Sequence, residues 1–123
     1  MLTQGDTFLL GNHLFIIISD PSANPDKMVL GALTTYETYK DQSCVLQAGE
    51  HSFIRHMTCV SYDFLDDMIV PVWEIEKRIR DGIAKQMDRV TDDVLRKILD
   101  GAQGTARIPN ASWIELNSQG LID

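Results

Sequence analysis

The feature that most constrains the fold is a change of hydrophobic periodicity at Val70-Pro71. Before this point, short apolar runs are separated by turn residues, which is typical of strands. After it, apolar residues recur every three or four positions, which is typical of amphipathic helices. The sequence therefore predicts one domain over residues 1–123, mainly β with a C-terminal α part, divided into a β part at about 4–70 and a helical part at about 71–123.

The β part is expected to contain five or six short strands. Gly11-Asn12 fits a two-residue hairpin turn, and residues 20–26, which include two prolines, fit an exposed loop. Short strands at this spacing favour a small antiparallel barrel, because closure removes exposed sheet edges. The expected strands are Thr7 to Leu10, Leu14 to Ser19, Met28 to Thr35, Ser43 to Leu46, Ser52 to His56 and Thr58 to Tyr62.

The helical part is expected to contain two or three helices. One apolar stripe predicts a helix at about 72–88, with Pro71 in its first turn; its members are Val72, Ile75, Ile79, Ile83 and Met87. Thr91 has the character of an N-cap, which predicts a second helix at about 91–102. Residues 105–123 fit either a short helix that begins at Pro109 or an extended tail.

The net charge of −7 disfavours nonspecific binding to nucleic acid or to an anionic membrane. Residues 1–70 alone carry three basic residues against nine acids. Any site for a polyanion must therefore be local. The longest apolar run, Leu14 to Ile18, is far shorter than the roughly 20 residues of a membrane span, so we expect a cytoplasmic protein with no membrane contact.

The densest group of functional side chains lies at Gly49 to His56, which holds two of the three histidines, His51 and His56, together with Arg55. If residues 51–56 form one regular strand, alternation places His51 and Arg55 on one face and His56 on the other. No histidine pair has the spacing of metal ligands, and the two cysteines are far apart in the sequence. We expect no metal and no cofactor.

The order of the elements resembles that of the MazF/PemK family of small toxin barrels. The residues that carry this resemblance are Gly5-Asp6 before a strand, Ile16-Ile17-Ile18-Ser19, Leu33-Thr34-Thr35, Thr58-Cys59-Val60 and the C-terminal helices. It covers roughly residues 4–90. The resemblance implies an SH3-like or CcdB-like barrel, a dimer, and a metal-independent endoribonuclease that an antitoxin peptide neutralises.

The resemblance also implies site residues. The family threonine at the end of the third strand corresponds to Thr34 or Thr35, whereas the family arginine before the second strand is replaced here by His13. Histidine is only partly charged near neutral pH but can transfer a proton, so this departure changes the chemistry available. The segment from His51 to His56 lies beyond the family motif.

Cleavage of RNA by its own 2′-hydroxyl needs a base, an acid and donors for the charge that develops on the phosphate. The candidate acid and base groups are His13, His51 and His56. Arg55 is the candidate phosphate ligand, and Thr34 and Thr35 are candidate orienting donors. Single-stranded RNA is then the expected substrate.

Two functions remain open from the sequence. The first is a toxin-like endoribonuclease of a prokaryotic toxin-antitoxin or phage-related system. The second is a noncatalytic barrel that binds an antitoxin-like or other regulatory protein. A homodimer is expected in either case, because the second strand is apolar on both faces: Leu14 and Ile16 alternate with Phe15 and Ile17.

Overall fold

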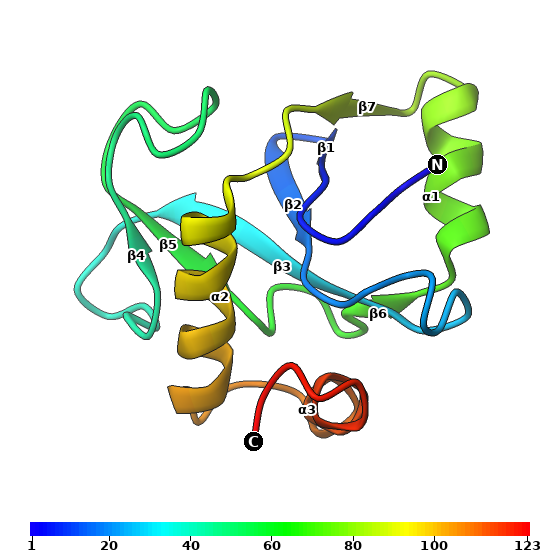
Figure 1. Cartoon of the computed structure of the whole chain (residues 1–123). Coiled ribbons are helices and arrows are strands. Elements are labelled where there is room, and N and C mark those ends of the chain that lie inside the picture. The colour runs from blue at the N-terminus through cyan, green and yellow to red at the C-terminus, as the bar shows by residue number, and fades with distance from the viewer.

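The computed structural model describes residues 1–123 and shows an antiparallel sheet with helices on both faces (Figure 1). The strands run in the order β4-β5-β3-β2-β1-β7, and β6 pairs separately with β3. The strands are β1 (Thr7–Leu10), β2 (His13–Ile17), β3 (Met28–Thr35), β4 (Val45–Leu46), β5 (Thr58–Ser61), β6 (Ile69–Val70) and β7 (Ala84–Met87). The helices are α1 (Val72–Arg80), α2 (Asp92–Gly104) and α3 (Asn110–Ser118).

The alternation of side chains along β2 divides the core into two clusters. Leu14 and Ile16 belong to the first cluster, with residues of α2 and α3 such as Ile98 and Leu116. Phe15 belongs to the second cluster, which α1 covers. The further members of the second cluster include Ile17, Phe8, Leu30, Met68 and Ile75. Both faces of β2 are therefore buried within one chain, and the apolar argument for a homodimer no longer holds.

The predicted barrel is not closed. β4 and β7 lie at the two ends of the strand order, and no ladder joins them. β4 pairs with β5 through only two residues, Val45 and Leu46, and the chain then leaves the sheet. What the sequence predicted correctly is the coarser arrangement: an antiparallel sheet with short connections, followed by helices.

The helix predicted at about 72–88 is wrong in its second half. α1 ends at Arg80, and Gly82 then has a φ of +77°, a left-handed conformation that favours glycine and reverses the chain. The next residues form β7, which pairs antiparallel with β1 from Ala84 to Met87. Ile83, which was expected in the apolar stripe, is 59% exposed. The part predicted as purely helical thus contributes a strand to the sheet.

The strand expected at Ser52 to His56 is also absent. Residues 47–57 form a loop of turns, in which the Gly49 N–H donates to the Ile54 carbonyl and the Ile54 N–H donates to the His51 carbonyl. Residues 52–56 pair with no neighbouring strand. The alternation argument for His51 and His56 does not apply.

The later helices agree with the sequence. The Thr91 side chain caps α2 by accepting a hydrogen bond from the Val94 N–H. Of the two alternatives for residues 105–123, the helix is confirmed: α3 begins directly after Pro109. None of the three helices has the length and apolar character needed to cross a membrane.

Candidate functional site

A groove of about 530 Å³ lies beside the C-terminal end of β3. It brings together five of the six residues singled out in the sequence, which are His13, Thr34, Thr35, Arg55 and His56. Its other lining residues are Asn12, Leu33, Ser52, Phe53, Ile54, Thr58 and Met87. The sixth candidate, His51, does not line this groove.

Three separate segments position these side chains. His13 is the first residue of β2, directly after the turn at Gly11-Asn12, where Gly11 has a φ of +63°. Thr34 and Thr35 are the last residues of β3 and pair with Cys59 and Thr58. Arg55 and His56 come from the loop at residues 47–57. The groove therefore depends on the register of the sheet and on the shape of that loop.

The charge of the groove differs from that of the chain as a whole. The chain has 18 acidic residues, yet none of the groove residues is acidic. Arg55 is exposed and takes part in no ion pair or side-chain hydrogen bond, so its guanidinium is available to a ligand. The groove combines this permanent cation with two of the three histidines, a set of groups that can bind an anion.

His13 has one engaged and one free ring nitrogen. Its Nδ1 atom lies 3.4 Å from the carbonyl oxygen of Leu33, and a carbonyl can only accept a hydrogen bond, so this contact places a proton on Nδ1. Nε2 has no partner and in the neutral ring is a free acceptor. The imidazole also packs against the ring of Phe64, with 4.4 Å between centroids.

His56 follows the same pattern in a more exposed setting. Its Nδ1 atom lies 3.1 Å from the Met57 carbonyl oxygen, which again leaves Nε2 without a partner. The Thr58 hydroxyl donates to the carbonyl of His56 over 2.9 Å and helps to fix the backbone of this residue. His13 and His56 can both exchange a proton through Nε2.

His51 is different, because both of its ring nitrogens are used. Its Nδ1 accepts from the N–H of Phe53 over 3.0 Å, so the proton lies on Nε2, which donates to the Asp88 carbonyl over 2.6 Å. The side chain is 7% exposed. We assign to His51 the task of holding its loop, and none of the proton transfer.

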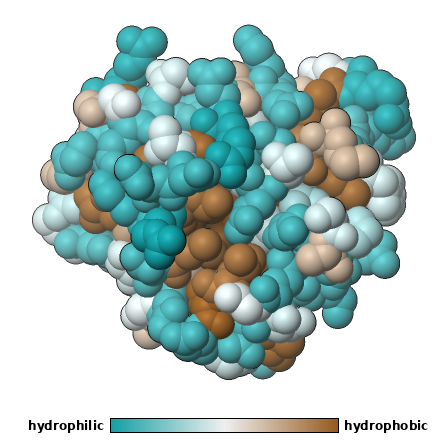
Figure 2. All heavy atoms as spheres, in the orientation of Figure 1, coloured by the Kyte–Doolittle hydropathy of each residue, from teal (hydrophilic) through white to brown (hydrophobic).

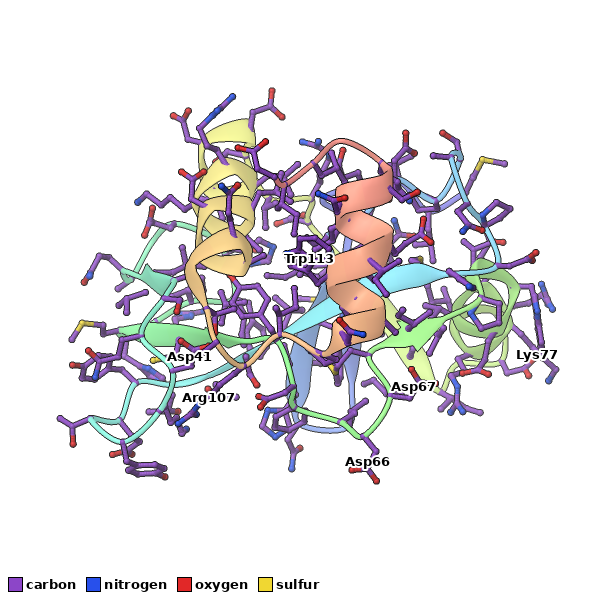
Figure 3. All side chains as sticks on the ribbon, turned by 90° about the horizontal axis from the view of Figure 1, so that it is seen from below. Asp41, Asp66, Asp67, Lys77, Arg107 and Trp113 are labelled. Atoms are coloured by element: carbon purple, nitrogen blue, oxygen red, sulfur yellow. The ribbon has the colours of Figure 1, made fainter.

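A second depression of about 280 Å³ shares His13, Thr34 and Thr35 with the groove. It brings in residues that the sequence analysis did not single out, Lys40, Phe64 and Arg107 among them. These residues lie on three different connections, so no local spacing in the sequence marks them as partners. Figure 3 shows Arg107 beside Asp41, near the connection between α2 and α3.

The arrangement offers two free imidazole nitrogens, one free guanidinium and the hydroxyls of Thr34 and Thr35, neither of which is used in a side-chain hydrogen bond. Such a set can bind a phosphodiester and move protons around it. Nowhere in the chain do three or more His, Cys, Asp or Glu side chains gather in a way that could hold a metal ion.

No family model, no curated protein and no solved structure matches this chain. The MazF/PemK resemblance stays a prediction from the sequence motifs.

Proposed function

We propose that this protein is a toxin-like endoribonuclease of the MazF/PemK type, which cleaves single-stranded RNA in the groove at the end of β3 without a metal ion. The single observation that supports the proposal most strongly is the convergence of His13, Arg55 and His56 on a groove free of acidic residues, in a chain with a net charge of −7. His13 is far in the sequence from the consecutive residues Arg55 and His56, so its convergence with them does not follow from sequence proximity.

The reaction follows from the free groups. One neutral imidazole, through Nε2, takes the proton of a ribose 2′-hydroxyl while the 2′-oxygen forms a bond to the adjacent phosphorus. The bond from phosphorus to the 5′-oxygen breaks, and the second imidazole, in its protonated form, donates a proton to that oxygen. The products are a 2′,3′-cyclic phosphate and a 5′-hydroxyl. His13 and His56 supply the two rings.

The remaining groups stabilise charge. The Arg55 guanidinium offers donors in a fixed fork to the nonbridging oxygens of the phosphate, whose negative charge increases during the attack. The hydroxyls of Thr34 and Thr35 are further donors at the end of β3. His13 stands where the MazF/PemK pattern has an arginine, so Arg55 supplies the cation from a different segment.

The experiment is cleavage of a mixed pool of single-stranded RNAs by purified protein in the presence of a chelator. We expect shortened RNAs whose new 3′ ends carry a 2′,3′-cyclic phosphate. A substrate with sulfur in place of the leaving 5′-oxygen then separates the two roles, because a thiolate leaves without an acid. The variant that lacks the acid should recover its rate on this substrate, and the variant that lacks the base should not.

A noncatalytic partner-binding function is the alternative, and exposed apolar surface favours it. Figure 2 shows apolar atoms gathered in the middle of one face of the molecule. Trp73 of α1 is 61% exposed and Ile114 of α3 is 54% exposed. Folded protein that neither cuts nor binds RNA would make an antitoxin-like or other regulatory protein the better proposal for its ligand. The homodimer is likewise a proposal, which light scattering tests.

A further inference from the structure

The second depression, which shares His13, Thr34 and Thr35 with the groove, has features of its own that the cleavage reaction does not use. Its volume of about 280 Å³ is slightly below the range of roughly 300–1,000 Å³ that is typical of small-ligand pockets. It therefore suits part of a polymer, such as one nucleotide, better than a whole cofactor. The depression and the groove share His13, so an RNA chain bound in the groove can extend into the depression.

Two cations line this depression. The Lys40 ammonium donates one hydrogen bond, over 2.8 Å, to the Thr35 carbonyl, which leaves two of its three donors free. The Arg107 side chain is exposed and takes part in no ion pair or hydrogen bond. Asp41 also lines the depression, and its negative charge offsets part of that of Arg107, so the depression has two cations and one anion.

The position of Arg107 is set by Asp41. The Thr105 hydroxyl donates to the Asp41 carboxylate over 2.6 Å and accepts from the Arg107 N–H over 3.0 Å. Burial acts to raise the pKa of Asp41, but hydrogen bonds from Ser43 and Thr105, with the charge of Arg107, hold it below its ordinary value. Asp41 is thus an ionised positioning residue, which fixes the start of the connection between α2 and α3.

The depression also has an aromatic wall. Phe64 is 37% exposed, and its ring is held by His13 on one side and by the edge of Phe15, with centroids 6.0 Å apart, on another. A ring that is fixed by its neighbours and still open to solvent is a platform on which any base can stack. The cations and the ring thus supply the two contacts that a nucleotide needs.

We propose that this depression is a nucleotide subsite, in which the base stacks on Phe64 and the phosphate binds Lys40 and Arg107. The inference rests on the proposed function in one respect: the bound nucleotide is the neighbour of the phosphodiester bond that is cleaved in the groove. The RNA then crosses the end of β3 at Thr34 and Thr35. The subsite governs affinity and the register of cleavage. The proton transfers belong to the groove.

The test is the binding of adenosine 3′,5′-bisphosphate, which has no internucleotide bond to cut. Binding is measured by changes in amide chemical shifts and by calorimetry. We expect the shifts of Lys40, Phe64 and Arg107 to change, and adenosine without phosphate to bind far more weakly. Arg107→Ala and Lys40→Ala should each lower the affinity on the order of 10-fold, and Phe64→Leu should lower it without altering its salt dependence. Arg96→Ala and Lys85→Ala, which remove exposed cations outside the depression, are the matched controls.

The outcomes separate the subsite from the nuclease. If the bisphosphate binds as described and RNA is not cut, the subsite stands and the catalytic proposal fails. If RNA is cut but Arg107→Ala and Phe64→Leu change neither the affinity for the bisphosphate nor the positions of cleavage, the subsite is overturned. Equal losses in the Arg96→Ala control would also overturn it, because the effect would then be one of overall charge.

Discussion

The Nε2 atom of His51 donates to the carbonyl oxygen of Asp88 over 2.6 Å, and this bond joins the two ends of an open sheet. His51 lies in the loop that follows β4, and Asp88 is the first residue after β7. The neighbouring Ser52 hydroxyl donates to the Asp88 carboxylate over 2.7 Å. Side-chain hydrogen bonds therefore connect the ends that a closed barrel would join by a ladder.

Replacement of His51 should lower stability. His51→Ala leaves the Phe53 N–H without its partner and removes one of the two hydrogen bonds to the Asp88 carbonyl, which also accepts from the Thr7 hydroxyl. The loss of these two part-buried bonds should cost about 1–2 kcal/mol. His56→Ala, at an exposed position, should change the free energy of unfolding by less than about 0.5 kcal/mol. Urea denaturation of both variants checks this, and equal stability of the two would remove the holding role assigned to His51.

Two glycines of α2 should respond oppositely to alanine. A Cβ at Gly101 would lie 2.5 Å from the Tyr62 hydroxyl and 2.9 Å from the backbone oxygen of Ser43, so Gly101→Ala should destabilise by about 1–3 kcal/mol or more. A Cβ at Gly104 meets nothing within 4 Å, so Gly104→Ala should stabilise by about 0.5–1 kcal/mol. The melting temperatures of the two variants, compared with that of the wild type, check this. An unchanged stability of Gly101→Ala would contradict the close packing of α2 against Tyr62 and Ser43.

Acid should destabilise the protein in part through Asp41. Because its pKa in the folded state lies below the ordinary value of 3.8, its stabilising effect is present above that value and is lost as the pH falls through the lowered pKa. Glu50, whose pKa hydrogen bonds from Lys97 and Gln47 also lower, acts in the same direction. Unfolding of the wild type and of Asp41→Asn from pH 7 to pH 2 should show an advantage of the wild type that disappears in acid. If the free energies of unfolding of the two proteins differed by the same amount at every pH, Asp41 would not contribute to the acid sensitivity.

The two cysteines should be inert in the folded protein. Burial, with the charge of Glu50 next, raises the pKa of the Cys44 thiol to about 12, and Cys59 is 1% exposed. A chromogenic disulfide reagent at neutral pH should react with neither thiol until denaturant is added, and with both afterwards. Rapid reaction of the native protein would show that β4 opens readily.

The sequence predicted β1 to β5 but missed β6, β7 and the end of α1. β1 and β3 have the predicted bounds, because their apolar runs are bordered by clear turn residues. The error at residues 81–88 arose because Ile83 and Met87 continue the spacing of Ile75 and Ile79 by coincidence. Asp81-Gly82 was the available signal for the end of α1, and the pairing of β7 with β1 is a contact between distant residues that periodicity does not reveal.

The sequence predicted five of the residues that form the candidate site, but it did not predict how they are arranged. The structure brings His13, Thr34, Thr35, Arg55 and His56 to one groove, although the strand expected at 52–56 is a loop. His51 looked equivalent to His56 in the sequence, and only its hydrogen bonds distinguish it. Lys40 and Arg107 were missed, because tertiary packing alone brings their connections together.

Catalysis in the groove is tested by the rate of RNA cleavage in the presence of a chelator. The proteins to compare are the wild type, His13→Gln, His56→Gln, Arg55→Ala and, as a control, Arg96→Ala, each checked for folding by urea denaturation. We expect both histidine variants to lose on the order of 10²-fold or more in rate, Arg55→Ala to be strongly impaired as well, and all three to remain as stable as the wild type. Arg96→Ala should keep the wild-type rate. Cleavage at an undiminished rate by His13→Gln and His56→Gln, or no cleavage by folded wild-type protein, would contradict catalysis in the groove.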